Sequence, residues 1–165
     1  MISPELLRRF SFSAGISPEK IVELAKIGKE ISVEAGHYFF REGEKVDNLY
    51  LILEGEVAIS MEIPDRETKT PVANQLAGEI ATKDVVVTSI TTGSPFGWAA
   101  IIPPNEAFMA AKATHPCNVV AFDTQELNAL MAADPELAYQ MTLQAAEIIR
   151  KRLRDVSIET LAFIA

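Results

Sequence analysis

Residue types that carry most enzymatic and metal chemistry are sparse in this chain. It contains two histidines, His37 and His115, and a single cysteine, Cys117. A metal site needs several imidazole, carboxylate or thiolate ligands, and an iron–sulfur cluster needs about four cysteines. The sequence has neither a serine–histidine–aspartate arrangement nor a glycine-rich phosphate loop. We therefore expect no enzymatic activity, no metal and no cofactor, with both histidines at the surface and Cys117 as a small core residue.

The charge pattern argues against nucleic acid as a direct partner. The 23 acidic and 15 basic residues give a formal net charge of −8, whereas binding to phosphate backbones depends on clustered cations. One basic cluster lies near the end of the chain and consists of Arg150, Lys151, Arg152 and Arg154. Acidic residues at helical spacing accompany it, so we interpret it as a solvated helix face, with docking of a partner as the alternative.

Length and hydropathy indicate one globular domain. The chain has 165 residues, of which 48% are hydrophobic, and a domain of this size hides roughly 70% of its unfolded surface. No apolar run approaches the roughly 20 residues that cross a bilayer, and the first residues lack the apolar core of a secretory signal. We expect a cytoplasmic protein that does not bind membranes.

Helix signals stand at both ends of the sequence, and strand signals lie between them. Ser3-Pro4-Glu5 and Ser17-Pro18-Glu19 each combine a capping hydroxyl, a first-turn proline and an acid. The second of these helices should end near Gly28. From Ile31 onward, short strands alternate with turns every eight to twelve residues, which is typical of a sandwich or barrel. We expect strands around residues 38–40, 49–53, 57–61, 85–90, 112–114 and 118–122, and assign nothing at 67–84.

After a short helix at residues 126–131, Asp134-Pro135-Glu136 predicts the start of a long one. No glycine or proline follows as far as Ala165, so this helix could reach roughly 45 Å. Its first apolar stripe is Leu137, Met141, Ala145 and Ile148. A second stripe alternates spacings of three and four, as in a coiled coil: Tyr139, Thr142, Ala146, Ile149, Leu153, Val156, Thr160 and Phe163. We expect the first stripe to pack on the domain and the second to form a homodimer; the alternatives are that one monomer buries both or that residues 161–165 fray.

Several phrases of the sequence resemble the cyclic nucleotide-binding domain family, which includes the catabolite activators and the fumarate–nitrate regulators. These phrases are Ala35-Gly36, Phe40-Arg41-Glu42-Gly43, the run at residues 49–57, Pro95-Phe96-Gly97 and Asp134-Pro135-Glu136-Leu137. The likeness covers nearly the whole chain except residues 67–84. It implies a mainly β fold with flanking helices, in which an eight-stranded jelly roll precedes a long dimerisation helix. We expect positive φ at the strand-junction glycines Gly36, Gly43 and Gly55.

The resemblance also implies where a ligand would bind. In this family a short helix after a Phe-Gly pair offers backbone N–H groups to a cyclic phosphate, an acid beside the glycine holds the ribose, and a later arginine pairs with the phosphate. The corresponding candidate ligand pocket comprises Phe96, Gly97, Trp98, Ala99, Ala100, Glu106, Ala107, Phe108 and Met109. We call residues 96–111 the cassette. A competing match, Gly78-Glu79-Ile80-Ala81, is interpreted as a loop because no Arg-Ala pair follows it.

This cassette departs from the family pattern at both charged positions. Trp98 stands where the acid is expected, and Ala107, preceded by Glu106, stands where the arginine is expected; no arginine occurs between Arg66 and Arg150. Breaking a buried ion pair by removing one partner typically costs about 3–5 kcal/mol. Binding of cyclic AMP or cyclic GMP by the usual residues is therefore not expected. The apolar replacements favour a neutral or aromatic ligand, or else they simply fill the cavity.

These observations lead to a specific hypothesis. Residues 1–133 form a sensor domain and residues 134–165 a dimerisation helix, with candidate contacts at Thr142, Ala146, Ile149, Leu153 and Val156. The function expected is non-enzymatic signal transduction or transcription regulation, in which an unknown small molecule changes how the helix is presented. The alternatives are a ligand-free dimerisation scaffold and the sensor half of a helix-turn-helix regulator. The phrase at residues 161–163 resembles the hinge that precedes a DNA-binding domain, and we expect no such domain in this chain.

Overall fold

The expected serine–proline signals do start the N-terminal helices. The computed structural model describes residues 1–65 and 82–164, without the side chains of Val156 and residues 159–164. Helix α1 spans Pro4–Arg8 and is capped by the Ser3 hydroxyl, which accepts a hydrogen bond from the Glu5 amide. After the short helix η1 (Ser11–Ser13), helix α2 spans Pro18–Ile27. The chain passes at Gly28 directly into the first strand, as the expected helix end required.

Eight strands form two four-stranded antiparallel sheets. They are β1 (Gly28–Val33), β2 (Tyr38–Phe40), β3 (Asn48–Glu54), β4 (Glu56–Pro64), β5 (Thr82–Thr91), β6 (Pro95–Phe96), β7 (Ala110–Ala113) and β8 (Cys117–Asp123). The strand orders are β1-β8-β3-β6 and β2-β7-β4-β5. Consecutive strands alternate between the sheets except for β4 and β5, which pair with each other in one sheet; this is a jelly-roll arrangement. The fold class expected from the resemblance is confirmed.

Tertiary pairing moves several boundaries away from those expected. Strand β1 begins three residues before Ile31 because residues 28–33 pair with residues 117–122 of β8. Strand β5 begins at Thr82, inside the segment left unassigned, because Thr82 pairs with Pro64 at the far end of β4. Helix α4 (Thr124–Ala133) is longer than residues 126–131 since the Asp123 carboxylate caps its first turn. The second match to a cassette, residues 78–81, lies outside the described residues.

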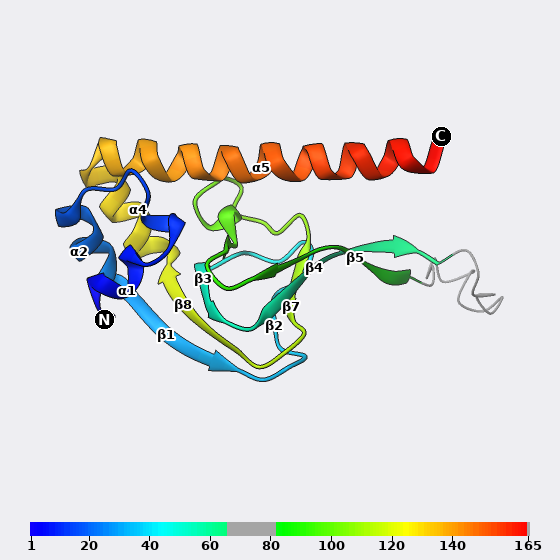
Figure 1. Cartoon of the computed structure of the whole chain (residues 1–165), viewed down its shortest axis with the longest axis horizontal. Helices are drawn as coiled ribbons and strands as arrows, with labels where there is room; N and C mark the ends of the chain where they lie inside the picture. Colours follow the sequence, from blue (N-terminus) through cyan, green and yellow to red (C-terminus); the bar gives the residue numbers. More distant parts are fainter. Residues whose placement is uncertain (66–81, 165) are drawn as a thin grey trace.

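The strands divide the interior into two packed layers. Between the sheets lies a core that includes Ile52, Val57, Ile59, Phe96 and Val119. The opposite face of the first sheet, where Leu49, Leu51, Val120 and Phe122 point, packs against the helices. This alternation follows from the two-residue period of a strand. Figure 1 shows the helices gathered on this side, with the long helix α5 (Pro135–Ile164) running along the length of the domain.

Positive φ is found at Gly36, Gly43 and Gly55, as expected. At Gly55, between β3 and β4, φ is +104°, and a Cβ would lie 2.6 Å from both the Cys117 Sγ and the Pro116 carbonyl oxygen. At Gly36 φ is +92°, and a Cβ would meet nothing within 4 Å. An alanine at Gly36 would therefore suffer backbone strain alone, whereas an alanine at Gly55 would suffer both backbone strain and steric overlap.

Gly55→Ala should destabilise the protein more than Gly36→Ala. A left-handed conformation costs a non-glycine residue about 1–2 kcal/mol, and both variants incur this cost. Only Gly55→Ala also forces an atom into a packed neighbour, which typically adds about 1–3 kcal/mol. The free energy of unfolding in urea measures both changes; equal losses would show that the contact with Cys117 relaxes without cost.

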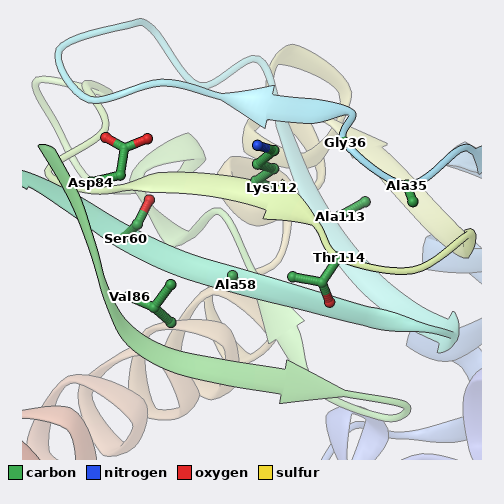
Figure 2. Close-up of a pocket in the computed structure, with 9 residues that line it drawn as sticks. All are labelled: Ala35, Gly36, Ala58, Ser60, Asp84, Val86, Lys112, Ala113 and Thr114. Atoms are coloured by element: carbon green, nitrogen blue, oxygen red, sulfur yellow. The ribbon is translucent and has the colours of Figure 1, made fainter.

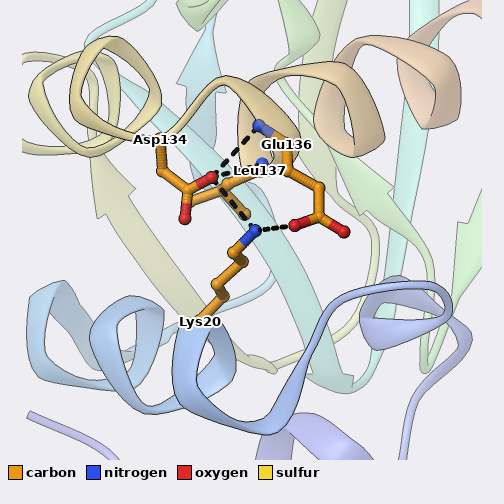
Figure 3. Close-up of polar contacts among 4 residues, drawn as sticks. All are labelled: Lys20, Asp134, Glu136 and Leu137. Atoms are coloured by element: carbon orange, nitrogen blue, oxygen red, sulfur yellow. Dashed lines mark hydrogen bonds and ion pairs between the residues drawn. The ribbon is translucent and has the colours of Figure 1, made fainter.

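A polar cluster fixes the start of α5 against α2. Figure 3 shows Lys20 of α2 reaching both Asp134 and Glu136, with Nζ–O distances of 3.0 and 2.5 Å. The Asp134 carboxylate accepts hydrogen bonds from the amides of Glu136 and Leu137. The Leu137 amide first, and then Lys20, hold the pKa of Asp134 below its ordinary value of 3.8. The helix start is therefore tied to the domain by its own cap residue.

Asp134→Asn should make the free energy of unfolding depend less on pH in the acidic range. Because the pKa of Asp134 is lower in the folded state than in the unfolded chain, its charge stabilises the fold above the unfolded pKa, and this contribution is lost as the pH falls through the folded pKa. Urea unfolding of both proteins between about pH 7 and pH 2 should show the difference shrinking toward acid. Asp155→Asn, at an exposed position on α5, is the control. A constant difference at every pH would contradict this role of the carboxylate.

Candidate functional site: the cassette and helix α5

The cassette begins with a backbone geometry that requires glycine. Gly97 has φ +82°, and a Cβ there would lie 2.8 Å from the Asn48 carbonyl oxygen of β3. Immediately after it, Trp98–Ala100 form the short helix η2. The sequence expectation of a turn into a short helix at this point agrees with the structure.

The far end of the cassette is fastened to the β2–β3 loop. The Asn105 side chain donates hydrogen bonds to the carbonyls of Ala99 and Ala100, at 2.8 and 3.0 Å, from a backbone with φ +65°. The Val46 amide donates to the Asn105 carbonyl, and the Ala107 amide donates to the Glu44 carbonyl. The cassette is thus held as a closed loop, and Asn105 is the residue that closes it.

The structure distributes the candidate pocket residues among different environments. Phe96 belongs to the core between the sheets, whereas Trp98, Ala100 and Ala107 belong to the helix-side core. Met109 is half-buried against the inter-sheet core. Whether they line a ligand site together remains a prediction.

Two residues near the end of the cassette point outward. Phe108 is 75% exposed, so the expectation that it adds apolar area inside the cavity is wrong. Glu106 is also exposed, and its backbone pairs with that of Lys45. Both lie where the cassette returns to β7, and alternation along an extended chain turns them away from buried Ala107. Glu106 therefore does not oppose an anion from inside the domain.

Aromatic side chains fill the inter-sheet layer beside Gly97. Phe96 stacks on Tyr50 with ring centroids 5.0 Å apart, and Phe39 meets both rings edge-on at 5.0 Å. Phe40 adds a fourth ring, 6.2 Å from Phe96. Edge-to-face and offset contacts of this kind stabilise a core beyond simple burial. The aromatic cluster occupies space that smaller side chains would leave open.

Trp98 carries a polar group without a protein partner. The side chain is only 6% exposed, and its indole Nε1–H has no acceptor among the described residues. An unsatisfied buried donor costs about 1–3 kcal/mol. The residue that follows Gly97 is therefore a buried hydrogen-bond donor.

Helix α5 places a second unpaired polar group on the domain side. Leu137, Met141 and Ala145 are buried, and Ile148 is half-buried, so the first predicted stripe packs on the domain as expected. Arg152 continues this stripe one turn later and is partly buried, with no ion pair to any side chain in the described ranges. Burial lowers the pKa of its guanidinium. The basic cluster is thus not wholly a solvated face: Arg152 turns inward, whereas Arg150, Lys151 and Arg154 are exposed.

The second predicted stripe of α5 is exposed at every position whose side chain the structure describes. Tyr139, Ile149 and Leu153 are 63%, 53% and 66% exposed, and Thr142 and Ala146 are exposed as well. The alternative in which one monomer buries both stripes is therefore wrong for these residues. The side chains of Val156, Thr160 and Phe163 lie outside the described set.

Three residues that matter to this geometry were not found from the sequence as site residues. Asn105 offers a weak signal, since asparagine tolerates positive φ. Arg152 was assigned to a charged run, and only its spacing from Ile148 could have placed it on the apolar stripe. Lys20 gave no signal, because its partners lie more than a hundred residues away.

The remaining chemistry-bearing residues lie where a structural role would put them. His37 and His115 are exposed and Cys117 is buried in the inter-sheet core, as expected. Burial raises the pKa of the Cys117 thiol. Within residues 1–65 and 82–164, no three histidine, cysteine, aspartate or glutamate side chains are grouped to hold a metal ion. No described helix has the length and apolar character needed to cross a bilayer.

Comparison with known proteins agrees with this geometry. The sequence model of the cyclic nucleotide-binding domain matches residues 30–134. A CRP-like cAMP-activated global transcriptional regulator from Mycobacterium tuberculosis is 26% identical over 150 residues, covering 91% of this chain and 58% of that protein. The chain therefore spans less than two thirds of that relative.

Solved structures show the same fold. A cyclic nucleotide-binding domain from Methylobacillus flagellatus aligns with a TM-score of 0.73 at 18% identity, covering 96% of this chain and 80% of that one. The catabolite activator protein of Thermus thermophilus aligns with a TM-score of 0.66 at 19% identity, covering 98% of this chain and 64% of that one. With a matching family model over most of its length and a jelly roll ending in a long helix, the chain belongs to the cyclic nucleotide-binding domain family.

Proposed function

We propose that this chain is a non-enzymatic sensor domain in which a small molecule at the cassette changes the position of α5 within a homodimer. The cassette and the helix belong to one packed cluster: Trp98, Ala100 and Ala107 share the helix-side core with Leu137 and Met141. Protein cores are too densely packed to absorb a shift locally. A displacement of Trp98 would therefore shift α5, the helix that carries the proposed dimer seam.

We further propose that the ligand is not held as a cyclic nucleotide usually is. No lysine or arginine occurs in residues 95–111, and Trp98 and Ala107 replace the acid and the arginine. The unpaired groups nearest the cassette and on the domain-facing stripe are the Trp98 indole N–H and the Arg152 guanidinium. Both are donors, so they favour an apolar or aromatic ligand that carries a hydrogen-bond acceptor.

A ligand-free dimerisation scaffold is the second candidate, and one observation favours it. The rings of Phe39, Phe40, Tyr50 and Phe96 already pack together beside Gly97. A domain whose interior is already filled by side chains can support a dimerisation helix without binding a ligand. A sensor must instead bind its ligand more tightly in one helix position than in another, since otherwise no signal results.

Trp98 supplies a direct test because it is the only tryptophan in the chain. The protein is titrated with benzamide and octanoate, which both carry hydrogen-bond acceptors, while its tryptophan emission and the hydrogen exchange of α5 amides are followed. A sensor should give a saturable emission change with at least one probe, together with altered exchange along α5. Trp98→Phe removes the optical signal and serves as its blank. If no probe changes either readout, the scaffold is the better account.

The relation to transcription regulators also enters as a proposal. The Mycobacterium tuberculosis relative is a transcriptional regulator of which this chain covers little more than half. We propose that the output of α5 is likewise regulatory, passed to a partner protein or to a DNA-binding domain.

A further inference from the structure

A hollow lies on the outer face of the sheet β2-β7-β4-β5, on the side away from the helices (Figure 2). It has a volume of about 510 Å³, within the roughly 300–1,000 Å³ of small-molecule sites. We call it the outer groove, defined by Ala35, Gly36, Ala58, Ser60, Asp84, Val86, Lys112, Ala113 and Thr114. None of the candidate pocket residues lines it, so it is separate from the cassette.

The strand register explains why this face is hollow. On β4, Val57 and Ile59 point into the inter-sheet core, so Ala58 and Ser60 point outward. Ala58 pairs with Lys112 of β7, and Ser60 pairs with Ala110 and Val86. Small residues therefore form the floor, and longer side chains stand only along the sides.

Ser60 offers an unpaired hydroxyl to the outer groove. It is 5% exposed and is the one buried polar or charged residue of the described chain. Its Oγ makes no hydrogen bond to any described residue, and Figure 2 shows it pointing from β4 into the space between Asp84 and Lys112. The Oγ atom is not among the fully enclosed unpaired atoms of the described residues, so it is open to the groove. The groove is the direction from which a partner can come.

Two opposite charges face the same space without pairing. Lys112 is partly buried and makes no ion pair with any described acid; its Nζ lies 4.9 Å from the Tyr38 ring centroid. Asp84 accepts only a long hydrogen bond, 3.4 Å, from the Tyr38 hydroxyl. Arg41 covers the Tyr38 ring at 3.7 Å and helps to hold this wall in place. The ammonium and the carboxylate therefore remain available on either side of Ser60.

We propose that the outer groove binds a small zwitterion of the α-amino acid type with an apolar side chain. The ligand carboxylate would be held by Lys112 and Ser60, and its ammonium by Asp84, while its side chain lies on Ala58 and Val86. A simple anion would be attracted by Lys112 but repelled by Asp84. A simple amine would be attracted by Asp84 but repelled by Lys112. Only a molecule with both charges satisfies both side chains.

The test uses L-valine and two analogues, each of which lacks one of its two charged groups. L-valine carries both charges, isovalerate lacks the amine, and isobutylamine lacks the carboxylate. Each is titrated into the ¹⁵N-labelled protein, and amide shifts at residues 58–60, 84–86 and 112–114 give the dissociation constants. L-valine should bind at least about tenfold more tightly than either analogue, because each analogue loses one charge-assisted contact. Equal binding of all three, or shifts with none, overturns the proposal.

Variants separate recognition from folding. Lys112→Met keeps the length of the side chain and should weaken L-valine at least about tenfold, while isobutylamine should bind at least as tightly as before because its ammonium no longer faces Lys112. Asp84→Asn, at an exposed position, should weaken L-valine, while isovalerate should bind at least as tightly as before because its carboxylate no longer faces Asp84. Lys151→Met, on the exposed side of α5, is the matched control and should bind as the parent does. If Lys112→Met and Asp84→Asn, each with a native-like spectrum, both retain full L-valine affinity, the assignment is wrong.

Discussion

Ile149→Asp should sediment as a monomer of 18.1 kDa at concentrations where the parent protein sediments at twice that mass. Ile149 lies in the middle of the exposed stripe that runs from Tyr139 to Leu153. In a twofold helix pair the substitution occurs on both sides of one seam, so two unpaired carboxylates would be buried together. Burying one such charge is already highly unfavourable.

Ile31→Asp is the control for this experiment. Ile31 is also an exposed isoleucine, but it lies on β1, on the other side of the domain from the seam. Its variant should keep the parent's sedimentation, and Leu153→Asp should repeat the effect of Ile149→Asp. A parent protein that is monomeric throughout, or an Ile149→Asp variant with unchanged mass, would contradict the proposed seam.

Met141→Ala should lower the free energy of unfolding by about 2–5 kcal/mol. Met141 is completely buried in the cluster that joins α5 to the cassette. Truncation removes apolar contacts and leaves a cavity that dense surroundings fill only in part. Such a loss is a large share of the roughly 5–15 kcal/mol by which domains are stable. Urea unfolding followed by Trp98 emission measures the change.

Leu143→Ala supplies the comparison on the same helix. Leu143 lies two residues further on and is 40% exposed, so its truncation should cost clearly less. If both variants lose the same stability, α5 is not anchored through its domain-facing stripe. In that case a movement of the cassette would have no packed route to the helix.

Much of the fold could be predicted from residues with strong local preferences. Ser3-Pro4 and Asp134-Pro135 start helices because proline and a capping side chain act within one turn. Helix α2 also starts at Pro18, although the expected cap by the Ser17 hydroxyl does not form. Glycines at strand junctions predicted positive φ, and the structure has positive φ at Gly36, Gly43 and Gly55. The strand boundaries that moved, such as those of β1 and β5, depend on pairing with distant strands, which no local preference encodes.

The candidate site was harder to predict, because its properties depend on which face a residue turns to. Phe108 was expected inside and is at the surface, since only the closure of the cassette onto the β2–β3 loop sets its direction. Arg152 and Ser60 look like ordinary polar residues in the sequence, and burial alone makes them distinctive. What the sequence could establish was the chemistry that is missing: a cassette without a cation.

The central claim is that this cassette no longer recognises a cyclic nucleotide phosphate. Calorimetric titration of the purified chain with cyclic AMP and cyclic GMP tests it most directly, with the Mycobacterium tuberculosis cAMP-activated regulator as positive control. Losing a buried charge partner costs about 3–5 kcal/mol, or roughly two to four decades of affinity. We therefore predict no saturable heat for this chain under conditions that saturate the control. Tight binding with one nucleotide per chain would contradict the account.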